Sequence, residues 1–149
     1  MCAGGIPIEN SINPMNACIA ALQIQDYMSK LKFDAIANHS DYWEIRLGLH
    51  TGPVVAGIIG DLKLAYDVWG PTVNQAQQME KFGAPGEVTI SGTTFTLIEP
   101  YFECKSKGKV KIKGGIEVDT YAVLKIKPEL SEKGEGLFPN DKFSEIVQL

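Results

Sequence analysis

Three short strand-like segments near the middle of the chain, separated by turn signals, constrain its fold more than any other feature. Apolar and polar residues alternate over residues 43–49, which predicts a half-buried strand. Residues 54–59 are almost continuously apolar, a pattern typical of a central strand covered on both faces. Residues 64–69 predict a third strand, and the turns are expected at Thr51-Gly52-Pro53 and residues 60–63. The chain is therefore expected to contain a β-sheet.

Helical patterns flank these strands. Residues 14–38 predict a long helix, because Pro14 suits a first helical turn and apolar residues recur at spacings of three and four. The face expected to be buried consists of Ala17, Ala21, Ile24, Met28 and Leu31. A second helix is expected over residues 71–82, and a brief third helix follows Ser91, which can act as its N-cap.

Further strands are expected over residues 87–90 and 118–126, and residues 101–113 predict a Lys-rich strand or hairpin. Strands and helices in this order favour an α+β fold, with a sheet that carries its helices on one side. We expect one domain over residues 1–127 and a polar C-terminal tail over residues 128–149. Four apolar residues of the tail could dock onto the domain, namely Phe138, Phe143, Ile146 and Val147.

Composition narrows the possible functions. The 149 residues are 44% hydrophobic and carry a net charge of −4, which is typical of an ordinary globular protein and disfavours nucleic acid as a partner. Three cysteines without a C-x-x-C spacing indicate neither a disulfide framework nor a zinc site, and favour a cytoplasmic location. The chain has no membrane segment, since no apolar run approaches the ~20 residues needed to span a bilayer.

Asp67 lies in the middle of the apolar and aromatic segment 64–69. A carboxylate is costly to bury there without hydrogen-bond partners. Asp67 is therefore either exposed to solvent or available to accept a hydrogen bond from a ligand. An ionised carboxylate only accepts hydrogen bonds. As a ligand contact, Asp67 would therefore favour adenine, which has an exocyclic amine, over guanine, which has a carbonyl at the same ring position.

Asn74 and Gln78 lie four residues apart and share one face of the helix expected after residue 70, with Lys81 nearby. This polar face is either a solvated surface or one wall of a cleft, and the start of the helix favours anions.

Lysines also alternate through the segment 101–113, at positions 105, 107, 109, 111 and 113. They either protect an edge strand or attract a phosphate group. His39 and His50 are isolated, and His50 before a turn favours a structural role.

Several segments, taken in order, resemble the catalytic domain of class III nucleotidyl cyclases. Residues 44–57 are similar to the family's central strand-turn-strand, and residues 66–74 to its purine-recognition strand and following helix. Residues 86–91 resemble a later landmark, as do Lys113-Gly114-Gly115 and Thr120-Tyr121. Each segment alone is weakly specific, but the ordered set over residues 1–127 is specific.

The resemblance implies a ferredoxin-like α+β core that lacks its N-terminal strands, and an active site between two subunits of a homodimer or with a partner cyclase subunit. It implies conversion of ATP to cyclic AMP and pyrophosphate in intracellular signalling, with two Mg²⁺ or Mn²⁺ ions. Asp67 matches the adenine-selecting carboxylate, where guanylyl cyclases usually have cysteine. Asn74 matches the asparagine that orients the ribose, and Lys113 matches the lysine that binds the terminal phosphates.

Two departures from the family pattern bear on activity. Gln78 stands where the family has a transition-state arginine, and a neutral amide cannot supply the bidentate cationic contact of a guanidinium. The family's metal-binding aspartates lie on strands before the segment that residues 1–7 resemble. We therefore expect this chain to be inactive alone. The alternative is a catalytically dead, cyclase-like module with a regulatory or nucleotide-binding role.

Overall fold

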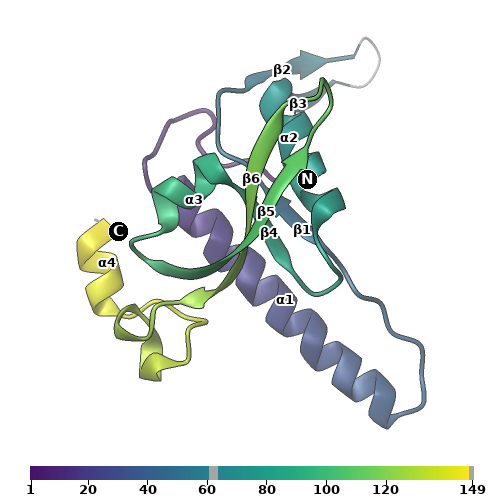
Figure 1. The fold of residues 1–149 in the computed structure, drawn as a ribbon, viewed down its shortest axis with the longest axis vertical. Helices are drawn as coiled ribbons and strands as arrows, with labels where there is room; N and C mark the ends of the chain where they lie inside the picture. The colour runs from purple at the N-terminus through teal and green to yellow at the C-terminus, as the bar shows by residue number, and fades with distance from the viewer. Residues whose placement is uncertain (61–63, 148–149) are drawn as a thin grey trace.

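The computed structural model describes residues 1–60 and 64–147, and contains a four-stranded sheet, a separate two-stranded sheet and helices (Figure 1). The order of elements is α1 (Asn13–Ala37), β1 (Leu47–Leu49), β2 (Val55–Ile59), β3 (Ala65–Trp69), α2 (Pro71–Phe82), β4 (Val88–Ser91), α3 (Gly92–Ile98), β5 (Phe102–Lys111), β6 (Glu117–Ile126) and α4 (Asp141–Val147), with short 3₁₀ turns at Pro128–Leu130 and Glu132–Gly134. The predicted α+β class is confirmed. The turn predicted over residues 60–63 falls mostly outside the described residues.

The four-stranded sheet has the order β1-β4-β6-β5, in which β1 runs parallel to β4 and the other pairs are antiparallel. Alternate residues of its strands face opposite sides. Val88 and Ile90 join the core formed with α1, whereas the intervening Thr89 contacts Gly83 at the end of α2. Helices α1 and α2 therefore cover opposite faces of the sheet, and the prediction that all helices lie on one side was wrong.

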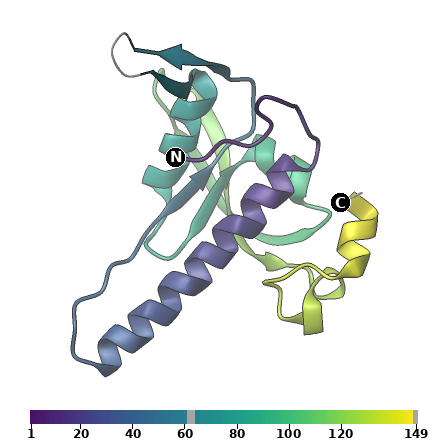
Figure 2. The ribbon, with the colours of Figure 1, turned by 180° about the vertical axis from the view of Figure 1, so that it is seen from behind.

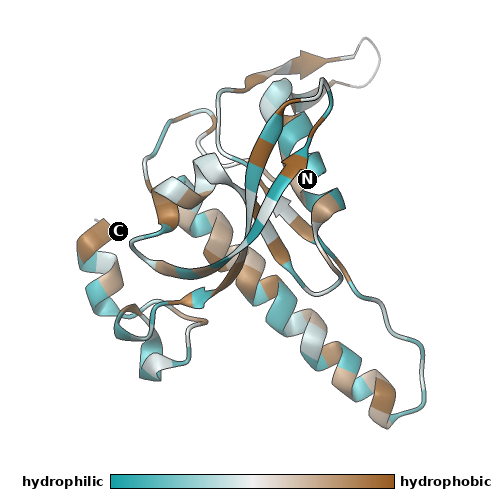
Figure 3. Ribbon diagram, in the orientation of Figure 1, coloured by the Kyte–Doolittle hydropathy of each residue, from teal (hydrophilic) through white to brown (hydrophobic). Residues whose placement is uncertain are grey.

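Helix α1 has the predicted extent but a different buried face. Its buried residues are Pro14, Met15, Cys18, Ala21, Leu22 and Gln25, so the predicted stripe shares only Ala21 with the observed one. Gln25 contributes to this orientation, because its side-chain amide donates to the carbonyl oxygens of Ile45 and Glu87 at 3.0 and 3.1 Å. The second half of α1 extends beyond the sheet and exposes apolar residues (Figures 2 and 3).

Strands β2 and β3 form an antiparallel hairpin, which we call the arm, with Val55 opposite Trp69 and Ile59 opposite Ala65. The prediction that residues 54–59 form a strand covered on both faces was wrong. Ile58 is 69% exposed and Tyr66 is 60% exposed. Within residues 1–60 and 64–147 no strand other than β3 pairs with β2, so its apolar side chains remain on the surface.

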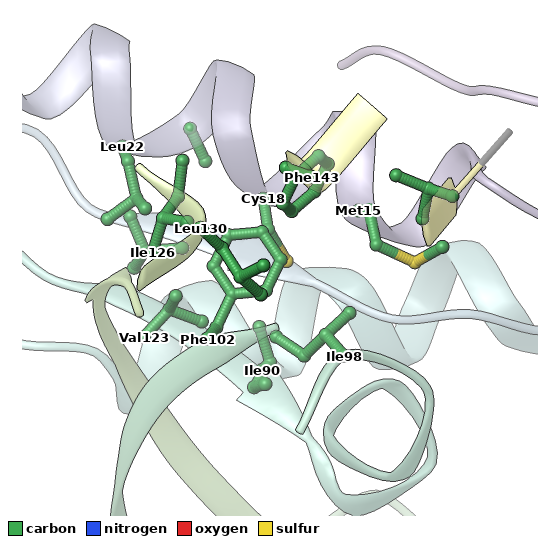
Figure 4. Packing of buried hydrophobic residues seen from close by; sticks show 13 residues of the cluster. Met15, Cys18, Leu22, Ile90, Ile98, Phe102, Val123, Ile126, Leu130 and Phe143 are labelled. Carbon is green, nitrogen blue, oxygen red and sulfur yellow. The ribbon is translucent and has the colours of Figure 1, made fainter. Parts of the chain in front are cut away.

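The hydrophobic core lies between α1, the four-stranded sheet and the C-terminal segment. Figure 4 shows Phe143 of α4 packed beside Cys18 of α1, with Phe102 and Leu130 nearby. Of the four apolar residues expected to dock from residues 128–149, Phe143 and Val147 are buried, whereas Phe138 and Ile146 are exposed. None of the helices over residues 1–60 and 64–147 combines the length and apolar character needed to cross a membrane.

Candidate functional site

The unit formed by β3, Gly70 and α2 carries three of the four candidate residues. Gly70 has a φ of 131°, a conformation that favours glycine, and it turns the chain from the strand into the helix. Pro71 then occupies the first helical position, where a missing N–H costs nothing. Asp67 therefore lies on the arm and Asn74 in the first turns of α2, on either side of one tight turn.

The Asp67 side chain is exposed and lies opposite Gly57 of β2. One of its carboxylate oxygens, Oδ1, accepts a hydrogen bond of 2.8 Å from the backbone N–H of Val68. In the described part of the chain no other protein donor bonds this carboxylate. Asp67 is thus an available acceptor on the surface.

Helix α2 separates a buried face from a polar face, as the sequence predicts. Met79 is 1% exposed, and Val73 and Ala76 are partly buried. Asn74 is exposed and Gln78 partly exposed on the other side of the helix. The polar face of α2 is therefore open to a ligand or to solvent.

Lys113 lies in the turn between β5 and β6 and is exposed. No hydrogen bond or salt bridge links it to Asp67, Asn74 or Gln78 among the residues that the structure describes. Of the other alternating lysines, Lys107 bonds Glu87, which holds the pKa of that carboxyl below its usual value. Asp67, Asn74 and Gln78 thus lie on one continuous unit, β3 and α2. Lys113 lies on the separate hairpin of β5 and β6.

A contact between β1 and α2, which sequence reasoning missed, holds the polar face of α2 in place. Gly48 packs directly against the α2 backbone, so an added Cβ would lie 2.6 Å from the Cα of Glu80 and 2.5 Å from the carbonyl oxygen of Ala76. Arg46 reinforces the contact with a 2.7 Å salt bridge to Glu80. A glycine inside a strand pattern is the signal that could have revealed this close approach.

A cavity of about 190 Å³ lies between the N-terminal residues, β1 and the buried face of α2. Its lining includes His50, Thr51, Thr72 and Thr94, but none of the four predicted site residues. His50 bonds Ser91 through Nδ1 at 2.6 Å, and burial lowers the pKa of its imidazole. The structural role predicted for His50 agrees with this geometry.

The residues at the site do not fit a metal centre by themselves. Within residues 1–60 and 64–147 there is no group of three or more His, Cys, Asp or Glu side chains that could hold a metal ion. The candidate site offers a ligand the hydrogen-bonding side chains of Asp67, Asn74 and Gln78. Lys113 adds a positive charge.

The fold is that of nucleotidyl cyclase catalytic domains. The family model of the adenylate and guanylate cyclase catalytic domain matches residues 1–125, and the chain belongs to this family. A curated relative, the soluble guanylate cyclase 89Db of Drosophila melanogaster, is 34% identical over 125 residues, which cover 83% of this chain and 18% of that protein.

Two solved structures share the fold. The guanylate cyclase domain of RhGC from Catenaria anguillulae, in complex with GTP, has 29% identity and a TM-score of 0.71, covering 80% of this chain and 64% of that one. The adenylyl cyclase CyaB from P. aeruginosa has 26% identity and a TM-score of 0.76, covering 88% and 67%. The chain thus spans less than a fifth of that curated relative and about two-thirds of the solved domains. Both guanylyl and adenylyl cyclases match, so family membership leaves the purine base open.

Proposed function

We propose that this chain provides the purine and phosphate side of an adenylyl cyclase site, which forms cyclic AMP and pyrophosphate from ATP between two subunits. The observation that carries the proposal is the exposed carboxylate of Asp67, on the strand that leads into α2, whose Oδ2 accepts no hydrogen bond within the described residues. Asp67 would accept from the adenine amine, Asn74 would orient the ribose, and Lys113 would bind the terminal phosphates.

Binding of nucleotides to the chain itself tests this proposal. We expect ATP to bind more tightly than GTP in calorimetric titration. Asp67→Asn should reduce this preference about tenfold, because a hydrogen bond to a charged group is lost and the new amide can also donate to guanine. Asp119→Asn, which removes an exposed carboxylate on β6, is the matched control and should keep the preference. Equal binding of ATP and GTP by the unaltered chain would refute adenine selection.

Two metal ions are part of the proposed reaction, and their ligands would come from outside the described residues, on an upstream segment or a partner subunit. We therefore expect no cyclic AMP from ATP and Mn²⁺ with this chain alone, measured by a product assay. A longer form of the domain that carries the family's aspartate-bearing strands should be active. Activity of the 149-residue chain by itself would contradict this expectation.

The second candidate function is a cyclase-like regulatory module without catalysis, and Gln78 is the residue that favours it. A neutral amide cannot replace a guanidinium that stabilises charge in a transition state, and loss of such a group often costs ~10²- to 10³-fold in turnover. Nucleotide binding by a longer form that makes no cyclic AMP would support this module. The cytoplasmic location and the division at residue 127 stay predictions.

A further inference from the structure

The arm, formed by β2 and β3, lies outside the four-stranded sheet. It shares no β-ladder with the four-stranded sheet among the described residues, and it projects from the body in Figures 1 and 2. The chain enters the arm through residues 50–54 and leaves it through residues 69–71, at the start of α2. The position of Asp67 relative to α2 therefore depends on how these two legs are held.

Side-chain hydrogen bonds gather at this base. On the entering leg, His50 Nδ1 bonds Ser91 Oγ at 2.6 Å, and Thr51 Oγ1 bonds Thr94 Oγ1 at 3.1 Å. Ser91 and Thr94 are 4% and 1% exposed, and they begin helix α3. These bonds fasten the entering leg to the main sheet and α3, but not to the leaving leg.

Among the described residues, the side chain of Thr72 joins the entering leg to the start of α2. Thr72, in the first turn of α2, donates from Oγ1 to the carbonyl oxygen of Pro53 at 2.6 Å. Thr72 is 9% exposed, and the legs meet so closely that a Cβ on Gly52 would lie 2.7 Å from Thr72 Oγ1. The bond is therefore short, largely shielded from water and packed on both sides.

We propose that Thr72 is a positioning residue that clamps the base of the arm and thereby fixes Asp67 relative to Asn74. The assignment rests on the proposed function, because it makes Thr72 a determinant of base selection. Thr72 would touch no part of the nucleotide. Its hydroxyl would act through the Pro53 carbonyl, which sets the angle at which β2 and β3 leave the body.

The position of the arm can be measured without a nucleotide. Spin labels at Ile58→Cys on β2 and Thr93→Cys on α3, both exposed sites, report the distance between arm and body. Cys2→Ser and Cys104→Ser remove the other accessible thiols, and Cys18 is fully buried. We expect Thr72→Val, which keeps the shape but removes the hydroxyl, to broaden or shift the distance distribution. Thr72→Ser should retain the distribution of the parent.

A matched control separates the clamp from the general loss of a hydroxyl. Thr96→Val removes a hydroxyl that donates to the Gly92 carbonyl at 3.0 Å within α3, away from the base of the arm, and should leave the distribution unchanged. If Thr72→Val does not fold, as judged by circular dichroism, Thr72→Ala replaces it. An unchanged distribution in a folded variant without the hydroxyl would overturn the clamp.

Nucleotide titrations then test the link to base selection. With the arm displaced, Thr72→Val should lose about fivefold in its preference for ATP over GTP, the effect expected for one hydrogen bond. Its preference for ATP over AMP should stay, because the proposed phosphate contact lies on another hairpin. If Thr72→Val displaced the arm but kept its preference for ATP over GTP, the proposed role of Thr72 in base selection would be overturned. If the unaltered chain binds no nucleotide, the proposed function fails, and the label distances still decide the clamp.

Discussion

Gly48→Ala should destabilise the domain by about 3 kcal/mol or more, the upper range for forcing extra atoms into a packed interior. The new methyl group would meet the backbone of α2 rather than a side chain that can rotate away. Its nearest neighbours would be the backbone nitrogen and Cα of Glu80 and the carbonyl oxygen of Ala76. The clash can therefore be relieved only if the whole of α2 moves away from β1. Urea unfolding monitored by circular dichroism measures the change in the free energy of unfolding.

If the proposed function holds, the same substitution should also weaken nucleotide binding in the protein that remains folded, because α2 carries Asn74, the proposed ribose contact. Gly92→Ala is the matched control, since a Cβ there would make only an ordinary 3.4 Å contact with Asp119 and the residue lies at the start of α3. It should be neutral or slightly stabilising, because alanine restricts the unfolded chain and favours the helix. If the Gly48 and Gly92 variants had the same free energy of unfolding, α2 would be able to move away from β1 at little energetic cost.

The extent of most elements could be predicted because their signals are local, but the strand expected over residues 43–49 was too long, since only Leu47–Leu49 forms β1. Helix α2 begins at Pro71 and ends at Phe82 as expected, since a proline, a polar face and a following Gly-Ala-Pro-Gly mark its ends. Ser91 caps α3 as expected and accepts a hydrogen bond from the Thr94 N–H. Such signals need only the neighbouring residues of the chain to act.

The burial of these elements could not be predicted, because it depends on partners far away in the sequence. Helix α1 has two apolar stripes, and spacing alone cannot choose between the one with Cys18 and the one with Ile24. The choice involves Gln25, whose amide bonds carbonyls on two separate segments. Residues 54–59 likewise look like a covered strand, yet their exposure depends on which strands are available to pair with β2.

For the candidate site, too, the elements that carry the residues could be predicted, but the long-range contacts that hold those elements could not. Asp67, Asn74 and Gln78 lie in β3 and α2 as expected, because sequence proximity places them on one continuous unit. The contacts that hold this unit, Gly48 against α2 and Thr72 against Pro53, join segments about twenty residues or more apart. No local pattern reports such contacts, apart from a glycine that interrupts a strand.

Phe143→Ala should cost about 3–5 kcal/mol, the range for removing a large buried aromatic side chain. Phe143 is fully buried and makes edge contacts with Tyr101 and Phe102, at ring-centroid distances of 5.7 and 6.2 Å. Asn140 holds α4 in place for this packing, because its side chain accepts from the Phe143 N–H and donates to the Glu129 and Ser131 carbonyls. An N-cap asparagine is a sequence signal that residues 128–147 are more than a solvated tail.

Phe138→Ala is the matched control for this substitution, because Phe138 belongs to the same segment but is 47% exposed. Its loss should change the free energy of unfolding by less than about 1 kcal/mol, as for most surface positions. Thermal and urea unfolding of both variants decide the matter. If Phe143→Ala were as mild as Phe138→Ala, α4 would be a detachable addition, and the core between α1 and the sheet would be stable without it.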